Sequence, residues 1–244
     1  MNTISVGNQM KPSTELKPCA GENCFEIIEV PIIELFSRKM DFRVLCDSCE
    51  EKYRQEIERK DRQERIERFK NAFDAICPPL YRNTDLGRIY GPFAETAMNY
   101  QFNPTGVLFE GPPGTGKTRA AWHILKRMVE AGKSCYGLTS TQFAKFAADQ
   151  WHSNAEDKGI ACEAMERCRR TSVLLIDDLG KQKMTDRSEL ELYDVLEWRT
   201  TNLKPTIITT NATGEQLKKM LSEDRGQPIL RRIRDFSQFI KFNA

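Results

Sequence analysis

The spacing of apolar and polar residues changes near residue 77 of this chain. Beyond that point, short apolar runs alternate with longer stretches of helical period. The runs are GVLFE (106–110), SCYGL (134–138), SVLLIDD (172–178), TIITT (206–210) and QFIKF (238–242). The helical stretches cover roughly 117–131, 141–150, 156–170, 187–202 and 214–223. This alternation predicts an α/β fold, in which helices cover both faces of a parallel five-stranded sheet.

A different pattern precedes this region. Residues 50–76 contain neither Gly nor Pro, and acidic and basic side chains are paired four residues apart, as in Glu58 and Arg62. Apolar residues gather at the two ends of the stretch, so its middle turns have no buried face. We expect a linker helix that crosses solvent between two domains. A basic DNA-binding helix is the alternative, but the near balance of charges favours the linker. CPPLY at 77–81 ends the helix.

Four cysteines cluster near the start of the chain, in the pattern C-x4-C followed by C-x2-C. Four thiolates suit a tetrahedral zinc ion, and a site of four protein ligands is structural rather than catalytic. The alternative is a set of unligated thiols. The predicted zinc ligands are Cys19, Cys24, Cys46 and Cys49. We therefore expect a disordered tail at 1–18, a zinc module at 19–49, the linker helix at 50–76 and the α/β domain at 77–244.

Composition limits the class of protein. The chain has 244 residues, 39% of them hydrophobic, and a net charge of +2. That charge excludes a uniformly basic, histone-like protein. The first twenty residues lack the apolar core of a signal peptide, and no apolar run approaches the length of a membrane span. We expect a cytoplasmic protein with reduced thiols and no membrane partner.

GPPGTGKT at 111–118 is the most informative string in the sequence. It fits the P-loop pattern G-x-x-x-x-G-K-[ST], between a predicted strand and a predicted helix. Its glycines let backbone N–H groups turn inward around phosphate oxygens, Lys117 places a cation on the β- and γ-phosphates of ATP, and the Thr118 hydroxyl ligates Mg²⁺. The predicted nucleotide-binding residues are Gly111, Pro112, Pro113, Gly114, Thr115, Gly116, Lys117, Thr118, Arg119 and Asp177.

Two later strands end in polar residues that complement the P-loop. SVLLIDDLG places Asp177 and Asp178 at the carboxyl end of a strand, where α/β sheets carry their ligands. We expect Asp177 to hold Mg²⁺ together with Thr118, and Asp178 to orient or deprotonate the attacking water. Asn211, after TIITT, can hold that water near the γ-phosphate. Solvated acids and an ordinary turn asparagine are the plain alternatives.

The order GPPGTGKT, VLLIDD, TIITTN and then an arginine-rich segment resembles the AAA+ ATPases. Within that superfamily, LLIDDLG and TIITTN resemble the helicase loaders of the DnaC/DnaI type and the similar IstB transposition helpers. The likeness covers about residues 77–242. It implies strand order 5-1-4-3-2, ATP hydrolysis, self-association with ATP at the subunit interfaces, and delivery of a DnaB-type replicative helicase onto single-stranded DNA.

The resemblance extends to GQPILRRIRDF at 226–236. It implies a helix whose arginine reaches the ATP of the neighbouring subunit, and Arg232 falls at the matching place. Arg231 and Arg234 are close enough to stay candidates. A guanidinium there stabilises the charge on the γ-phosphoryl oxygens in the transition state. A basic surface helix, or phosphate contacts to DNA, are the alternatives.

Two features depart from the AAA+ pattern. Asp178 stands where many members have glutamate, so we expect slow hydrolysis that partners stimulate. The chain ends at Ala244, soon after the last predicted strand, so we expect the C-terminal helical lid to be missing or vestigial. Both features suit an adaptor that depends on its partners.

Three functions fit the sequence: a helicase loader that acts on single-stranded DNA, an IstB-like transposition helper that binds duplex DNA, and a small-molecule P-loop kinase. The first two share nearly all the motifs. The zinc module and the linker helix favour the loader, because they suggest an arm that grips another protein. A kinase needs neither an arginine from a neighbour nor a zinc module. The expected cofactors are ATP, Mg²⁺ and Zn²⁺.

Overall fold

The computed structural model divides into two compact units, 1–65 and 66–244, and each is described by itself. The structure describes residues 14–35, 38–39, 44–151, 153–181 and 183–243. Within these ranges, every helix is too short or too polar to span a bilayer.

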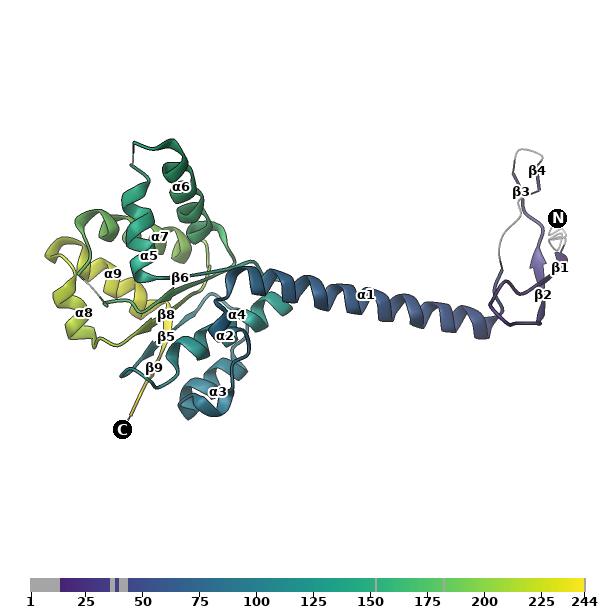
Figure 1. The fold of residues 1–244 in the computed structure, drawn as a ribbon, viewed down its shortest axis with the longest axis horizontal. Coiled ribbons are helices and arrows are strands. Elements are labelled where there is room, and N and C mark those ends of the chain that lie inside the picture. Colours follow the sequence, from purple (N-terminus) through teal and green to yellow (C-terminus); the bar gives the residue numbers. More distant parts are fainter. Residues whose placement is uncertain (1–13, 36–37, 40–43, 152, 182, 244) are drawn as a thin grey trace, which may run out of the picture. The chain divides into compact units, whose positions relative to one another are not determined.

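The larger unit is built on one parallel sheet (Figure 1). Its strands are β5 (Gly106–Glu110), β6 (Cys135–Thr139), β7 (Val173–Asp177), β8 (Thr206–Thr210) and β9 (Ser237–Lys241). They lie in the order β6-β7-β8-β5-β9, and all four neighbouring pairs are parallel. Numbered along the chain, this is 2-3-4-1-5, which is the expected order 5-1-4-3-2 read from the other edge.

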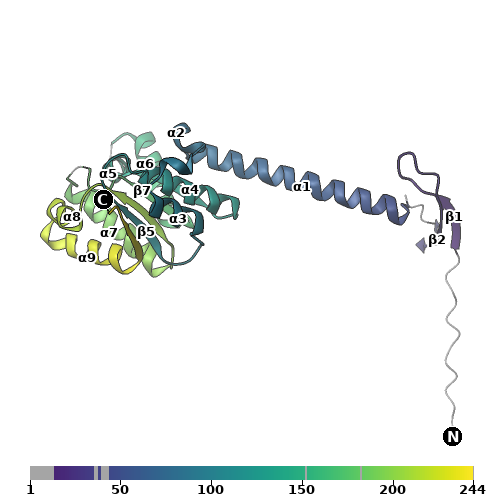
Figure 2. The ribbon, with the colours of Figure 1, turned by 90° about the horizontal axis from the view of Figure 1, so that it is seen from below.

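Helices cover both faces of this sheet (Figures 1 and 2). They are α2 (Pro79–Arg82), α3 (Gly91–Asn99), α4 (Lys117–Glu130), α5 (Ser140–Asp149), α6 (Ala155–Arg170), α7 (Asp186–Thr201), α8 (Gly214–Met220) and α9 (Glu223–Asp235), with a 3₁₀ turn, η1, at Leu86–Arg88. Side chains alternate along each strand. Val107 and Phe109 therefore join one core with α3 and α4, while Leu108 joins the other with α5, α7 and α9.

The helical period of the sequence predicts α4, α5, α6, α7 and α8, whereas it predicts none of α2, α3 and α9. Gly226 and Pro228 lie inside α9 and weaken its helical pattern, so only the family resemblance indicated a helix there. The Ser222 side chain caps the helix by accepting a hydrogen bond from the backbone N–H of Arg225. Apolar residues such as Ile229 then bury one side of α9 against the sheet.

A buried arginine joins α7 to the end of α6. Arg199 is fully buried, and its guanidinium donates hydrogen bonds only to uncharged oxygens. The acceptors are Thr206 Oγ1 and the carbonyls of Cys168, Arg169, Thr171, Ser172 and Pro205, at 2.6–3.4 Å. Burial lowers the pKa of Arg199 to about 10, so the group stays protonated at neutral pH. It satisfies carbonyls that the end of α6 and the starts of β7 and β8 leave open.

Arg199→Met should therefore lower the free energy of unfolding by about 3 kcal/mol or more, because several buried carbonyls lose their donors at once. Urea unfolding measures the change. Arg170→Met is the matched control, since the Arg170 side chain is 76% exposed and pairs with Glu166 on the surface. Equal losses in the two variants would contradict the capping role of Arg199.

The smaller unit begins with two short hairpins. β1 (Thr14–Pro18) pairs with β2 (Ile27–Pro31), and β3 (Glu34–Leu35) pairs with β4 (Arg38–Lys39), both antiparallel. Residues 14–18 therefore correct the expected disordered tail. Exposed and half-buried residues alternate along β1, as they do in a strand with one covered face. The pairing with β2 lets this strand form, whereas the same residues in an isolated peptide would not form it. The expected tail also includes residues 1–13, which lie outside the described residues.

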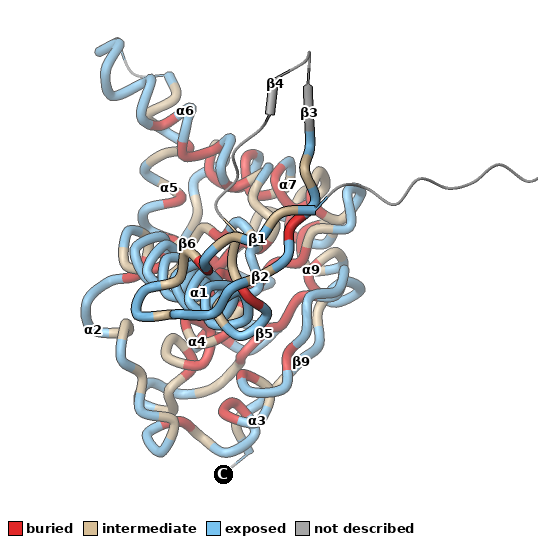
Figure 3. The backbone as a smooth tube through the Cα atoms, turned by 90° about the vertical axis from the view of Figure 1, so that its right-hand side faces the viewer, coloured by how far each residue is buried: buried red, intermediate tan, exposed pale blue. Residues whose placement is uncertain are grey.

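The predicted linker helix is α1 (Asp47–Ile76), which starts three residues earlier than expected. Residues 50–65 are exposed, as the charge pattern predicts (Figure 3). The last turns differ, because Phe73 is buried and meets Trp122 edge-on with ring centroids 6.3 Å apart. Phe69 and Ile76 also pack against this core, at helical spacing from Phe73. The larger unit thus begins at residue 66, before the expected boundary at 77.

Candidate nucleotide and metal sites

The P-loop string forms the turn between β5 and α4. Gly114 and Gly116 have φ values of 85° and 87°, a conformation that favours glycine. A Cβ on Gly116 would also lie 2.8 Å from Ile89 Cα. Gly116 is the N-cap of α4 and makes no side-chain capping bond, so the first N–H groups of the helix face the loop without a capping oxygen. That geometry fits a phosphate group.

Lys117 lies over this loop. It is 5% exposed, and its Nζ donates a 2.8 Å hydrogen bond to the carbonyl of Pro112. Burial lowers the pKa of Lys117, while Asp178 and Asp177 act in the opposite direction. The ammonium is therefore close to both acids and held by a neutral acceptor, which a phosphate oxygen can replace.

The two residues predicted to hold magnesium lie together. Asp177, at the end of β7, is 7% exposed, and its Oδ1 accepts a 2.9 Å hydrogen bond from the Thr118 hydroxyl. Burial raises the pKa of Asp177, and hydrogen bonds from Thr209 and Thr118 oppose the rise. A carboxylate and a hydroxyl at this spacing are the hard oxygen ligands that Mg²⁺ prefers, so the residues fit the ion.

The next acid is held differently. Asp178 has a φ of 57°, a left-handed conformation that is uncommon for a residue with a side chain. Its side chain is 30% exposed and lies 3.9 Å from Lys181 Nζ. Asn211 follows β8, the neighbour of β7, and is exposed at the same edge of the sheet. The structure therefore places Asp177, Asp178 and Asn211 at one edge, beside the P-loop.

The sequence did not point to several residues around this loop. Tyr90 donates its backbone N–H to the carbonyl of Thr115 at 3.0 Å, and its ring lies 4.6 Å from that of Phe242. A Cβ on Gly111 would lie 2.6 Å from Phe242 Cβ. These aromatic residues come from opposite ends of the unit and carry no motif. Two buried hydroxyls, Thr209 and Ser140, were missed for the same reason.

Arg232, the candidate arginine finger, is engaged within its own subunit. It forms an ion pair with Glu197, and its guanidinium lies 4.4 Å from the ring centroid of Tyr193. It also donates to the Tyr193 hydroxyl at 3.1 Å and to the Pro228 carbonyl at 3.2 Å. The side chain is 19% exposed. To contact the phosphate of a nucleotide in a neighbouring subunit, Arg232 has to break at least its ion pair with Glu197.

The other two candidates differ from Arg232 in exposure. The side chains of Arg231 and Arg234 are 76% and 70% exposed, and both pair with Asp235 at the surface. Surface pairs of this kind are weak, so these arginines are free to meet other anions. Arg232 is therefore held by groups of its own subunit, whereas Arg231 and Arg234 lie at the surface.

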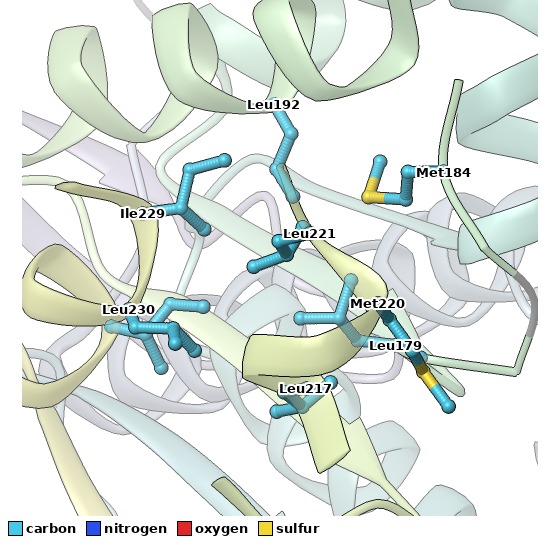
Figure 4. Close-up of a pocket in the computed structure, with 10 residues that line it drawn as sticks. Leu179, Met184, Leu192, Leu217, Met220, Leu221, Ile229 and Leu230 are labelled. Carbon is cyan, nitrogen blue, oxygen red and sulfur yellow. The ribbon is translucent and has the colours of Figure 1, made fainter. Parts of the chain in front are cut away.

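Apolar side chains connect α9 with the elements that follow Asp178 and Asn211 (Figure 4). They surround a small cavity and come from the loop after β7, from α7, from α8 and its C-terminal end, and from α9. The residues are Leu179, Met184, Leu192, Leu217, Met220, Leu221, Ile229, Leu230 and Ile233. A shift of α9 would therefore displace the packed side chains that lie next to the acidic pair, Asp177 and Asp178.

The family model of the IstB-like ATP binding protein matches residues 95–243, which is more than half of the chain. The chain belongs to the IstB-like ATP-binding protein family. The match contains the P-loop, both acids, Asn211 and the arginine helix of this IstB-like protein.

The chain is also similar to individual proteins. The uncharacterized protein YdaV of Escherichia coli K12 is 24% identical over 179 residues, covering 69% of this chain and 70% of YdaV. The replicative helicase loader DnaC of the same strain is 23% identical over 178 residues, covering 68% of this chain and 70% of DnaC. The crystal structure of DnaI gives a TM-score of 0.51 at 18% identity, over 62% of this chain and 81% of DnaI. The expected AAA+ fold is confirmed.

The four-cysteine cluster of this IstB-like protein lies outside the matched residues. Its four Sγ atoms all lie within 4.8 Å of one another, and those of Cys24 and Cys46 are 3.7 Å apart. Tetrahedral zinc with Zn–S bonds of about 2.3 Å separates its sulfurs by about 3.8 Å. The thiols therefore fit the ion that the spacing predicts, although the ion itself stays a prediction.

Backbone groups support the same interpretation. The N–H groups of Cys46 and Gly21 point to Cys19 Sγ at 3.2 and 3.4 Å. These bonds, with that of Cys46 first, lower the pKa of Cys19 to about 7 and so favour a thiolate. A Cβ on Gly21 would lie 2.5 Å from Cys49 Sγ, so only glycine lets the chain pass this close to the cluster.

The purified protein should contain one Zn²⁺ per chain, and Cys46→Ser should lose it, because a structural site needs all four thiolates. Elemental analysis of reduced protein measures the metal. Cys162→Ser is the control, since Cys162 is exposed on α6 and far along the sequence. Removal of the metal by a chelator should unfold the hairpins without changing ATP binding. Wild-type protein without zinc would contradict the site.

Proposed function

We propose that this protein is an ATP-dependent loader of a ring-shaped replicative helicase. It binds and hydrolyses ATP in its IstB-like unit, assembles side by side, and delivers the helicase onto single-stranded DNA. Similarity to DnaC over about two thirds of the chain supports the ATPase half of this proposal. The observation that carries the loader over its alternatives is the exposed apolar face of the N-terminal hairpin.

That face is built from both strands of the hairpin. Leu16 lies opposite Glu29, and Ile27 lies opposite Pro18. Partner residues of an antiparallel pair lie on the same face, so Leu16 and Ile27 share one face. Leu16 is 73% exposed and Ile27 is 66% exposed, and nearby Phe25 is 94% exposed. A cluster of this kind on a small unit is typical of a protein-binding surface.

The ATPase chemistry follows from the residues at the edge of the sheet. Lys117 binds the β- and γ-phosphates, and Thr118 and Asp177 would hold a magnesium ion, which offsets phosphate charge. Asp178 orients the attacking water, and Asn211 holds it near the γ-phosphate. Arg232 of one subunit leaves Glu197 and stabilises the transition state in the next. This need for a neighbour makes hydrolysis depend on assembly.

DNA contacts are expected to be weak for a single subunit. The net charge is +2, so one chain neutralises few phosphates. Assembly with ATP places one modest basic patch per subunit along the strand. Arg231 and Arg234 are candidates for this patch because both are exposed.

A transposition helper is the second candidate, and the match to the IstB-like family favours it. The two functions differ in the DNA they recognise and in the protein they hold. Stimulation of hydrolysis by duplex DNA but not by single-stranded DNA would favour the helper. A small-molecule kinase has no comparable support, because neither the family nor the exposed hairpin indicates one.

The proposal is tested by binding of the purified replicative helicase to the full chain. The double variant Leu16→Ser, Ile27→Ser should weaken binding at least tenfold, because it removes apolar area from the hairpin face. ATP affinity and zinc content should stay unchanged. Ile160→Ser is the matched control, since Ile160 is 54% exposed on α6. Equal helicase affinity for the double variant and the wild type would count against the gripping surface.

A further inference from the structure

A single buried hydroxyl contacts both acids at the end of β7. Thr209, on β8, is fully buried, and its Oγ1 donates to Asp177 Oδ1 at 2.6 Å. The same oxygen accepts the backbone N–H of Asp178 at 2.8 Å. A threonine hydroxyl has one hydrogen and two lone pairs, so these contacts define how it is oriented. Thr209 thereby ties the carboxylate of one acid and the backbone of the next to the central strand.

A second buried hydroxyl holds the other side of Asp178. Ser140, the first residue of α5, is 6% exposed and donates to the Asp178 carbonyl at 2.7 Å. The backbone N–H of Leu179 donates to the Thr209 carbonyl at 2.8 Å. Both peptide groups next to the Asp178 side chain are therefore fixed. Such fixing is needed, because a left-handed φ of 57° is unfavourable for a residue other than glycine.

The fixed turn gives the two acids different surroundings. Asp177 is 7% exposed and contacts Thr118 and Thr209, whereas the side chain of Asp178 is 30% exposed. One carboxylate thus stays with the predicted metal ligands while the other is open to water. Thr118 belongs to the helix after the P-loop, so Thr209 is the contact that ties the buried carboxylate to the sheet.

We infer that Thr209 and Ser140 are positioning residues for this acidic pair. Thr209 holds Asp177 in place for the magnesium ion, and Thr209 and Ser140 together hold the turn that directs Asp178 at the attacking water. This inference rests on the proposed ATPase function. It separates the two roles: Thr209 acts on metal affinity and on turnover, whereas Ser140 acts on turnover alone, because the described hydrogen bond of its hydroxyl goes to Asp178 and not to Asp177.

The neighbour of Thr209 supplies a matched control. Thr210 is also fully buried on β8, and its hydroxyl also makes short hydrogen bonds, to the Leu179 carbonyl at 2.6 Å and from the Ala212 N–H at 3.0 Å. Neither partner is an acid. Thr209→Val and Thr210→Val therefore remove the same group from the same strand at equal burial, and only the first removes a contact with the acidic pair.

The test measures the affinity for a fluorescent ATP analogue as Mg²⁺ is varied, together with kcat and KM. In Thr209→Val, the Mg²⁺ concentration that gives half of the increase in affinity should rise about tenfold, and kcat should fall about tenfold or more. Affinity without Mg²⁺ should not change. Thr209→Ser should restore both quantities, and Ser140→Ala should lower kcat while leaving the Mg²⁺ dependence as in the wild type.

Two results would overturn the inference. One is a Thr209→Val protein with the Mg²⁺ dependence of the wild type. The other is a Thr210→Val protein that shows the same shift, which would mean that any buried hydroxyl of β8 matters only for packing. The Mg²⁺ titration of nucleotide binding needs no turnover. A wild-type protein without ATPase activity would therefore contradict the proposed function and still leave Thr209 testable.

Discussion

Arg232→Ala should lower the rate of ATP hydrolysis about a thousandfold while leaving ATP affinity within a few fold of the wild type. The described partners of Arg232 are Glu197, Tyr193 and Pro228, and none of these belongs to the P-loop. Its loss should therefore spare binding in the same subunit and remove transition-state stabilisation in the next. Steady-state kinetics and fluorescent-nucleotide titration separate the two effects.

A mixing experiment extends this test. Arg232→Ala lacks the finger, and Asp178→Asn lacks the acid that orients water, so interfaces formed between the two variants should regain a complete site. Activity should reappear on mixing and should depend on protein concentration. Arg231→Ala is the matched control, because Arg231 is 76% exposed and pairs only with Asp235 in the described contacts. Equal losses for Arg231 and Arg232, or no recovery on mixing, would contradict the assignment.

Lys117→Ala should weaken ATP binding at least a hundredfold, because Lys117 is the cation of the P-loop and is already nine-tenths shielded from solvent. Lys117 Nζ donates to the uncharged carbonyl of Pro112, so removal of the ammonium breaks no described ion pair in the loop. The fold of the loop should therefore be retained. Nucleotide titration measures the affinity, and circular dichroism checks the fold.

Lys181→Ala is the control for Lys117, since Lys181 lies 3.9 Å from Asp178 but its side chain is 67% exposed. It adds a similar charge near the site without belonging to the loop, so its removal should change ATP affinity little. Tight nucleotide binding by folded Lys117→Ala protein would count against the phosphate-binding role of the loop.

The parallel sheet of the larger unit could be predicted because its strands carry a strong local signal. Apolar runs such as VLLI are short and end in polar residues, which places them inside a parallel sheet. The observed β7 (Val173–Asp177) and β8 (Thr206–Thr210) match their predicted runs closely. The same signal placed Asp177 and Asn211 at one edge, because parallel strands end together.

Other features could not be predicted, because they depend on partners distant in the sequence. The role of Thr209 follows from its 2.6 Å contact with Asp177, 32 residues away, and a threonine in a strand carries no signal of such a contact. The ion pair of Arg232 with Glu197 joins α9 to α7 in the same way. Phe73 lies in the apolar cluster that the sequence shows at the end of the linker helix, but the aromatic core that covers it comes from α4 and carries no local signal.

In the N-terminal unit, one feature could be predicted from the sequence and another could not. Four thiols within 4.8 Å agree with the spacing of the cysteines, because metal ligands carry a pattern that survives in the sequence. The sequence did not predict the strand at Thr14–Pro18, because Leu16 stands there among polar residues. The strand can be recognised only when its partner strand, Ile27–Pro31, is known.

The most direct test of the loader is delivery of the replicative helicase onto a closed circle of single-stranded DNA, which a ring can encircle only after it opens. With ATP and the wild-type protein, the helicase should displace an oligonucleotide annealed to the circle. Lys117→Ala and the Leu16→Ser, Ile27→Ser variant should fail to support displacement, while Ile160→Ser should support it. Displacement that is equal with and without the protein, or ATPase stimulation by duplex DNA alone, would contradict the loader function.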